Sequence, residues 1–336
     1  MQIRRNNYTL LEILFVICIV VIIINMLLPA FNESREKARF VRWLGFNKQC
    51  SSDPTCVINF NFQEGKGSIL TNTAAGNENI KFNAKDYYGV IKSNNFVSKN
   101  GDWVKGRWWK GKRALRFDGT TIVEIPKSDA IDFGEEDDFT IIIWLKFDKF
   151  EKWSTPYCKS YADQYAQYDM YYDNTTYPGN PNAKPPIPPY KALFEIDVSR
   201  TCVGYDDKYW SVDGKSLSPN IEMDTSHWYM MTLRNKVEKS PANPGLGNIN
   251  DHRVDVFWNG YALYGSRQTN NVLAKGIHCN AKLILGAMRF WNGQNSGEGY
   301  LGCFFKGRID EFIIYRRALQ DSEIRGQFMM GQEHHY

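Results

Sequence analysis

The sequence has little of what builds a metal site or a nucleic-acid site. It contains 5 histidines in 336 residues, and no two of its 7 cysteines form a C-x-x-C pair, which argues against zinc. Its 41 Lys and Arg are nearly balanced by 37 Asp and Glu, and no basic run is long enough to follow a phosphate backbone. Phosphate-binding Gly-rich loops, nucleophile elbows and HExxH motifs are also absent. A mean hydropathy of -0.46 excludes a polytopic membrane protein.

One apolar stretch differs from this average. Leu10–Ala30 reads LLEILFVICIVVIIINMLLPA, which is long enough to cross a bilayer as one helix. A cleaved signal peptide is the alternative, because Arg4 and Arg5 precede the stretch. However, no small-x-small cleavage site follows, and a helix-favouring sequence continues beyond Pro29. We therefore expect a membrane helix.

Glu12 is an ionisable residue inside this apolar stretch. A charge in that position costs about 2.5–3.5 kcal/mol on insertion scales, so a compensating partner such as a free amino terminus is expected. The order Asn7, Tyr8, Glu12, apolar run, Pro29 and polar helix resembles the N-terminus of type IV pilins and type II secretion pseudopilins. Members of this family usually have Gly as the residue just before the site where a peptidase cleaves the leader, where this chain has Asn7.

The pilin resemblance implies processing and assembly. A prepilin peptidase would remove residues 1–7 and leave Tyr8 as a methylated N-terminus. Glu12 would then neutralise the amino terminus of a neighbouring pilin-like subunit, and Pro29 would kink the helix. The chain would cross the bacterial inner membrane once through a helix over residues 8–45, and the resemblance implies a place in a pilus or pseudopilus.

Basic residues flank both ends of the apolar stretch and leave its orientation in the membrane open. The compartment of the remaining chain is therefore inferred from its cysteines. Six cysteines lie outside that stretch, and an even number suits an oxidising, periplasmic or extracellular space. Pairing by nearest neighbours predicts Cys50–Cys56 in a linker over 46–56, Cys158–Cys202, and Cys279–Cys303. The alternative is reduced, buried thiols in a cytosolic domain.

From residue 57 the sequence changes to short β-type runs separated by Gly, Asn, Asp and Pro. This pattern predicts an antiparallel β-sandwich or barrel, and Asn259-Gly260 predicts a two-residue hairpin turn. The expected strands include residues 57–62, 114–117, 122–125, 139–147, 192–198, 228–233, 254–258, 283–285 and 309–315.

The β-type region resembles the laminin-G-like, concanavalin A-like jelly roll over residues 57–330. The resemblance rests on FNFQEGKG at 60–67, GKRALRFDG at 111–119, HWY at 227–229 and KGRIDEF at 306–312. It implies a mainly β fold with a short helix after the last strand and a tail at 331–336. Residues 151–191 are rich in Tyr and Pro, and we expect an irregular insertion there, either a solvated loop or a ligand-contacting one.

Two carboxylates of a predicted strand, Glu195 and Asp197, resemble part of the E-x-D-x-E motif of glycosidases on related jelly rolls. The third position is Ser199, so the proton donor of that mechanism is missing. A glycoside hydrolase using Glu195 therefore remains an alternative, and the protein is not expected to be an enzyme.

Laminin-G-like domains often hold a structural Ca²⁺, and the resemblance makes Asp118 and Asp310 its candidate ligands. Each aspartate equally fits a structural role, in a turn or against the backbone. Trp291 and Asn292 lie in a loop-like stretch and are candidate glycan-binding residues, since sugars stack on exposed indoles.

The sequence thus predicts a membrane-anchored pilin-like protein that displays a laminin-G-like sandwich. Its expected partners are the prepilin peptidase, other pilin-like subunits, the inner membrane and a glycan or extracellular protein, with no nucleic acid. A signal-anchored binding module that does not polymerise is the second alternative.

Overall fold

The computed structural model describes most of the chain. It covers residues 9–74, 88–108, 111–133, 137–161, 165–172, 176–177, 190–191, 194–198, 223–239, 250–268, 281–290 and 300–332. Several predicted residues lie outside these ranges, namely Asn7, Tyr8, Ser199, Cys202, Cys279, Trp291 and Asn292.

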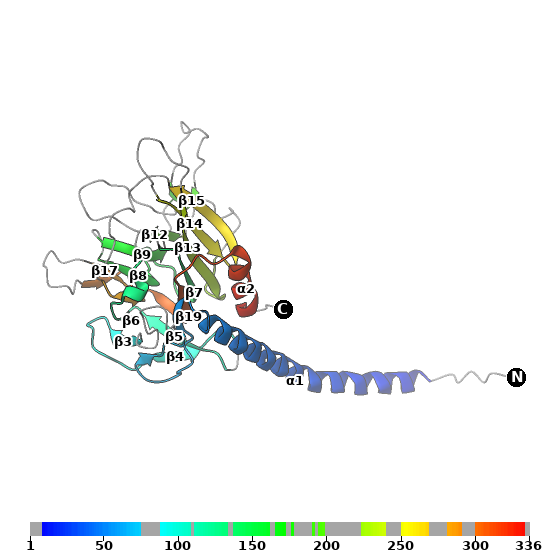
Figure 1. The fold of residues 1–336 in the computed structure, drawn as a ribbon. Coiled ribbons are helices and arrows are strands. Elements are labelled where there is room, and N and C mark those ends of the chain that lie inside the picture. The colour runs from blue at the N-terminus through cyan, green and yellow to red at the C-terminus, as the bar shows by residue number, and fades with distance from the viewer. Residues whose placement is uncertain are drawn as a thin grey trace.

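The chain begins with a single long helix, α1 (Leu10–Ser51), of 42 residues. It continues through Pro29 without a break and ends where Asp53-Pro54 introduces turn residues. The predicted linker from residue 46 is therefore wrong, because the helix extends six residues past residue 45. Figure 1 shows the helix leaving the β-rich body as a rod that bends along its length.

The first sheet is antiparallel and contains eight strands. Strand β19 lies between β7 and β5, and β1 also pairs with β19. The Asn259-Gly260 turn joins β14 to β15, as predicted. The sheet order is β15 (Tyr261–Gln268), β14 (Asn250–Trp258), β13 (Tyr229–Lys239), β7 (Phe139–Phe147), β19 (Lys306–Tyr315), β5 (Arg113–Asp118) and β4 (Asp102–Lys105), with β1 (Cys56–Phe60) beside β19.

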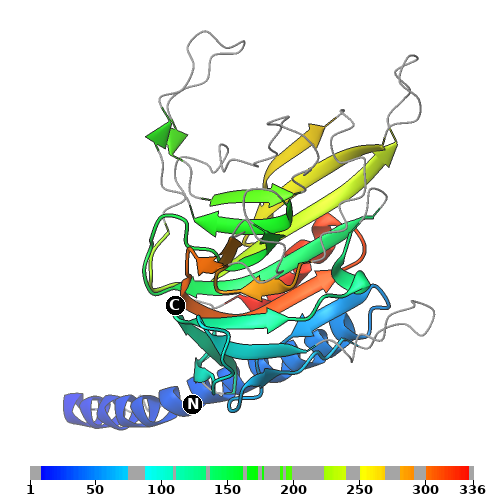
Figure 2. The same ribbon diagram turned by 90° about the vertical axis from the view of Figure 1, so that its left-hand side faces the viewer.

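The second sheet is also antiparallel and faces the first (Figure 2). Its order is β12 (Phe194–Val198), β9 (Tyr165–Tyr172), β8 (Tyr157–Tyr161), β16 (Leu283–Leu285), β6 (Thr121–Ile125), β3 (Gly89–Ser93) and β2 (Ile69–Leu70). Smaller elements are the hairpin of β17 (Met288–Phe290) and β18 (Tyr300–Gly302), the pair β10 (Thr176–Tyr177) and β11 (Tyr190–Lys191), and the 3-10 turn η2 (Asp129–Ile131).

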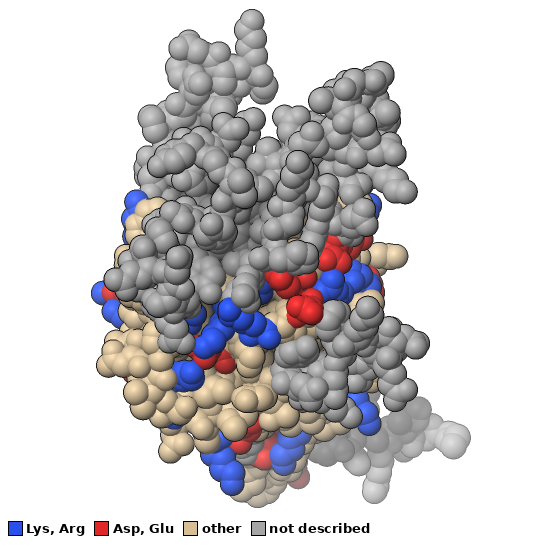
Figure 3. Space-filling view, turned by 60° about the vertical axis from the view of Figure 1, so that its left-hand side comes forward, with Lys and Arg blue, Asp and Glu red and all other residues tan. Residues whose placement is uncertain are grey.

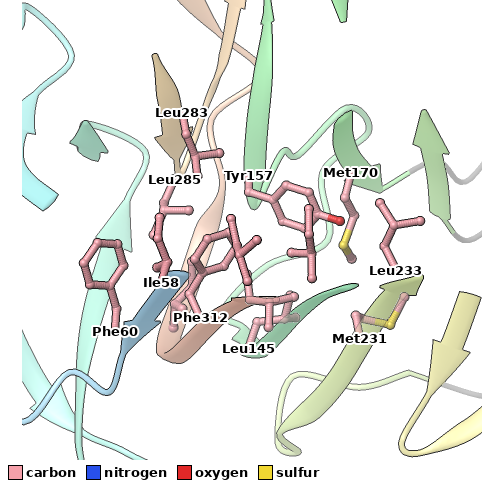
Figure 4. Close-up of a cluster of buried hydrophobic side chains, with 14 of the residues drawn as sticks. Ile58, Phe60, Leu145, Tyr157, Met170, Met231, Leu233, Leu283, Leu285 and Phe312 are labelled. Carbon is pink, nitrogen blue, oxygen red and sulfur yellow. The ribbon is translucent and has the colours of Figure 1, made fainter. Parts of the chain in front are cut away.

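The hydrophobic core lies between the two sheets. Figure 4 shows side chains from both layers pointing toward one another, including Leu145 and Phe312 of the first sheet and Tyr157 and Leu283 of the second. All four side chains are at most 1% exposed. The predicted antiparallel β-sandwich with one long N-terminal apolar helix is therefore confirmed.

The two helices form a third layer on the outer face of the first sheet. The C-terminal part of α1 and the helix α2 (Asp321–Gly331) pack there against a second cluster of buried side chains. Trp144 of β7 and Phe257 of β14 belong to that cluster and point away from the sandwich core. Because both faces of β7 are covered, its run FTIIIWLKF is almost continuously apolar, which is typical of a fully buried strand.

Within the Tyr- and Pro-rich stretch at 151–191, where we predicted an irregular insertion, much of what the structure describes is regular strand. Its described residues include β8 and β9, which pair with each other and belong to the second sheet. Tyr157 and Met170 contribute side chains to the core from these strands. Aromatic side chains have high strand propensity, and here this propensity outweighs the loop-like composition.

Candidate functional site

The first half of α1 is exposed along its length in the described part of the chain. An 18-residue window of it has a mean hydropathy of 3.1, and none of that window is buried. Large apolar side chains project from it on all sides, with exposed fractions from 42% at Ile19 to 86% at Leu10. By length and composition, this helix is able to cross a membrane.

Glu12 takes part in capping the N-terminus of α1. Thr9 is the N-cap residue, and its hydroxyl accepts a hydrogen bond from the Glu12 N–H at 3.3 Å. In return, a Glu12 carboxylate oxygen accepts from the Thr9 N–H at 2.8 Å and from the Thr9 hydroxyl at 3.0 Å. This reciprocal capping box satisfies backbone donors that a helix start otherwise leaves open.

The C-terminal part of α1 is attached to the sandwich through one face. Trp43, Asn47, Cys50 and Ser51 are its buried side chains. The Trp43 indole lies 5.4 Å from that of Trp108, ring centre to ring centre. Both indoles are at most 2% exposed, so they form the apolar part of the joint between helix and sandwich.

A buried ionic network completes this joint. The Arg107 guanidinium forms ion pairs with Asp310 at 2.9 Å and with Glu311, and also donates to the Gly331 carbonyl of α2 at 3.2 Å. Glu311 in turn accepts from the Asn47 side-chain amide of α1 at 3.0 Å. We call Asn47, Arg107, Asp310 and Glu311 the junction network. It links both helices to the centre of the first sheet.

A β-bulge in β19 explains how two consecutive residues of one strand both contact the same cation. The register between β19 and β7 shifts between Ile309 and Glu311. In a regular strand, neighbouring side chains point to opposite faces. The extra residue changes this alternation, so Asp310 and Glu311 both reach Arg107. The Arg107 guanidinium also lies over the Trp144 ring at 4.0 Å.

Burial dominates the electrostatics of the junction. Desolvation raises the pKa of Asp310 even though Arg107 and Lys112 favour its charged form. Desolvation also lowers the pKa of Lys112 to about 8. The Lys112 ammonium lies 4.2 Å from the centre of the Trp43 ring and donates to the main-chain oxygens of Asn61 and Asp310. These contacts tie its charge to the helix joint.

Asp310 is thus a member of the junction network and fully buried between cations. Asp118, the other candidate calcium ligand, closes the turn after β5. One of its oxygens accepts from the N–H groups of Thr120 and Thr121 at 2.8 and 2.9 Å. Among the described residues, no three His, Cys, Asp or Glu side chains are grouped to hold a metal. The calcium site stays an untested prediction, and both carboxylates already have protein partners.

The candidate catalytic pair lies on β12, at one end of the second sheet. Glu195 is opposite Tyr171 and Asp197 is opposite Asp169 on β9. These register positions are all that the structure describes of the pair, and Ser199 falls outside the described residues. The structure places neither residue beside the junction network.

The cysteine prediction needs one correction. Cys50 and Cys56 are not joined in a disulfide and are present as buried thiols. The Cys50 sulfur accepts from the Gln327 amide at 3.1 Å, while the Cys56 thiol is directed to the Ile58 carbonyl at 3.5 Å. Each sulfur therefore has a different partner, and burial raises the pKa of Cys50 to about 11. Cys202 and Cys279, in the other two predicted pairs, lie outside the described residues.

A second charged cluster lies on the outer side of the second sheet. Glu124 of β6 pairs with Lys92 at 2.8 Å, with Lys282 at 2.9 Å and with Arg289 at 3.3 Å. Burial alone would raise the pKa of Glu124, but hydrogen bonds from Lys92 and Lys282 lower it overall. Among the described residues on the face shown in Figure 3, Lys, Arg, Asp and Glu side chains gather in small groups between uncharged residues.

Comparisons with known proteins add the following. No protein-family model and no curated protein matches the chain. Among solved structures, domain 4 of the extracellular arabinanase AbnA from Geobacillus stearothermophilus, in complex with arabinotriose, is 14% identical with a TM-score of 0.47. The alignment covers 81% of this chain and 98% of that domain.

Two toxin domains are similar to the same degree. The binding domain of Paraclostridial Mosquitocidal Protein 1 is 15% identical with a TM-score of 0.47, and the match covers 82% of this chain. A botulinum neurotoxin type C structure is 11% identical with a TM-score of 0.45, over 83% of this chain. The chain spans about half the length of both, 52% and 51%. At TM-scores below 0.5, these similarities carry no argument about function.

Proposed function

We propose that the chain is a membrane-anchored, pilin-like subunit that holds a β-sandwich just outside the bacterial inner membrane. One observation supports this proposal above all. A single uninterrupted helix is apolar and unpacked in its first half, and is fixed to the sandwich by the junction network in its second half. Such a helix is a stiff connection that would hold the sandwich at a fixed distance from the membrane.

The dimensions suit this role. At 1.5 Å per residue, the 22 residues from Leu10 to Phe31 extend about 33 Å, close to the roughly 30 Å thickness of a bilayer core. In water their exposed apolar surface would cost roughly 25 cal/mol for each Å². A membrane, or the helices of neighbouring subunits within it, removes that cost.

The capping box offers a second explanation for Glu12 besides the neutralisation of a neighbour's amino terminus. The two explanations differ in whether the charge matters. A glutamine at position 12 keeps both capping hydrogen bonds but removes the charge, because Glu and Gln serve equally in a capping box. Replacing Thr9 by alanine does the opposite, since it removes the hydroxyl that caps the Glu12 N–H and keeps the carboxylate.

The test compares Glu12→Gln with Thr9→Ala in the full chain. We expect both variants to insert into the inner membrane. Only Glu12→Gln should lose self-association, measured as co-purification of a tagged copy with an untagged one from detergent extracts. Normal co-purification of Glu12→Gln would contradict the proposed role of the charge. Loss in Thr9→Ala alone would show that Glu12 serves only as a cap.

Mass spectrometry of the native N-terminus tests processing separately. The proposal expects a methylated Tyr8 as first residue, produced by a prepilin peptidase. A chain that keeps Met1 would instead be a plain signal anchor that does not polymerise. The glycoside hydrolase alternative has no further support, since the described part of β12 gives only register positions for Glu195 and Asp197.

A further inference from the structure

Trp153 is an exposed aromatic residue that the sequence analysis missed. It lies in the connection between β7 and β8, at the rim of the sandwich. It is 43% exposed, and no other tryptophan among the described residues is as exposed. Trp43, Trp108 and Trp144 are each at most 2% exposed. An indole that projects into solvent is therefore unusual among the described residues.

The backbone at Trp153 is in a conformation that a bulky residue rarely adopts. Its φ angle is +69°, in the left-handed region where the Cβ atom crowds the following carbonyl. Gly or Asn would occupy this position with less strain. Strained residues persist when the surrounding structure enforces them, and they concentrate at binding sites.

Several contacts enforce this conformation. The Trp153 N–H donates to the Tyr172 carbonyl at 2.8 Å, and the Thr155 hydroxyl donates to the Trp153 carbonyl at 2.9 Å. The Tyr172 N–H returns a bond to the Ser154 carbonyl at 2.9 Å, which fixes the loop to the end of β9. Phe150, three residues earlier, packs on Tyr172 with ring centres 5.2 Å apart. The backbone that carries the indole is thus held in place before any ligand arrives.

The surroundings of the indole are charged as well as apolar. The Lys152 ammonium lies 5.0 Å from the ring centre. Glu151, the residue before Lys152 in the same loop, forms ion pairs with Lys149 at 2.7 Å and Lys306 at 3.0 Å. A flat apolar ring beside charged hydrogen-bonding groups matches a sugar, which has an apolar C–H face and a rim of hydroxyl groups.

We propose that Trp153 is the stacking platform of a glycan-binding site that takes a pyranose ring, with Lys152 and Glu151 bonding its hydroxyl groups. A prepositioned ring gains affinity because little ordering is needed on binding. The site does not involve the membrane helix, so the glycan-binding proposal can be wrong while the pilin-like proposal is right, and the reverse. The proposed site makes glycans with a pyranose ring the ligand class of the sandwich.

The first experiment measures binding of the full chain in non-ionic detergent to an array of immobilised glucan, xylan, galactan and chitin oligosaccharides. We expect at least one of these probes to be retained, and Trp153→Ala to weaken that binding about ten-fold or more. The control is Tyr88→Ala, which removes another exposed aromatic ring, 45% exposed, outside this loop. It should bind as the unchanged chain does. Failure of the unchanged chain to retain any probe, or equal binding by Trp153→Ala, would overturn the proposal.

A second measurement tests the strain. Trp153→Gly and Trp153→Ala both remove the indole, but only glycine tolerates the left-handed backbone without cost. Trp153→Gly should therefore melt about 2–4 °C above Trp153→Ala. Both variants should lose glycan binding together. Equal melting temperatures would show that the backbone is not held against its preference, and the argument from strain would be overturned.

Discussion

Arg107→Met is the most informative single change in the junction network. Methionine has a similar length but no charge, and Arg107 is completely buried. The change leaves Asp310 and Glu311, whose side chains are 0% and 4% exposed, without their shared cation. Removing one partner of a buried ion pair costs about 3–5 kcal/mol. The Gly331 carbonyl of α2 also loses its donor.

The expected loss is about 3–5 kcal/mol in the free energy of unfolding, a large part of the 5–15 kcal/mol typical of a domain. Urea unfolding of the full chain in detergent, followed by tryptophan fluorescence, measures it. The matched control is Arg116→Met. Arg116 is 47% exposed and pairs with Asp148 at 3.1 Å, so its loss should cost at most about 1 kcal/mol.

The pH dependence of the Arg107→Met variant provides a second check. Without the cation, the pKa of Asp310, which burial already raises, would rise further in the folded state. The folded state then keeps a proton that the unfolded state releases. The deficit relative to the unchanged chain should therefore be smaller at pH 4 than at pH 8. An Arg107→Met loss no larger than that of Arg116→Met, or a deficit that grows in acid, would refute the reasoning.

Three further predictions concern a turn, a cap and the helix joint. Gly260→Ala should cost about 1–3 kcal/mol in urea unfolding, because φ is +79° and the new Cβ would lie 2.8 Å from the Cβ of Phe328. Asp118→Asn should cost about 1 kcal/mol at pH 7, a value reduced for its 44% exposure. Hydrogen bonds outweigh burial and lower the pKa of Asp118 to about 2, so this difference should disappear as pH falls from 3.8 toward 2. Asn47→Leu should cost about 2 kcal/mol, because Glu311 loses a donor, and should speed proteolysis of α1 near its end. Unchanged cleavage would contradict that role for Asn47.

Much of the sandwich was predictable because strand pattern and turn chemistry agree. The runs at 139–147 and 283–285 coincide with β7 and β16, and the Asn259-Gly260 turn joins β14 to β15 as expected. In each case the signal is local, since alternation or an apolar run between turn residues specifies a strand without reference to distant residues.

The prediction failed where a residue's partner is remote in sequence. The Tyr-rich residues of β8 and β9 have a loop-like composition, yet they form strands that pair with each other, and β8 also pairs with the distant β16. The pairing of Asp310 with Arg107, 203 residues away, likewise has no signal in the sequence, while the calcium prediction for Asp310 stays untested. The bulge in β19 that brings Asp310 and Glu311 to one cation has no sequence signal of its own. The strain at Trp153 likewise depends on Tyr172.

The place of β19 in the first sheet also bears on how the protein matures. This strand is the last one that the structure describes, yet it lies at the centre of its sheet and supplies Glu311 to Asn47 of α1, 264 residues earlier. A ribosome therefore completes the apolar helix long before it synthesises the strand to which the C-terminal part of that helix is bound. Until β19 has emerged, the growing sheet lacks its middle strand and exposes the edges of β5 and β7. Such open edges invite mispairing, so a nascent chain of this design should require a chaperone for longer than one whose sheet grows outward from a finished centre.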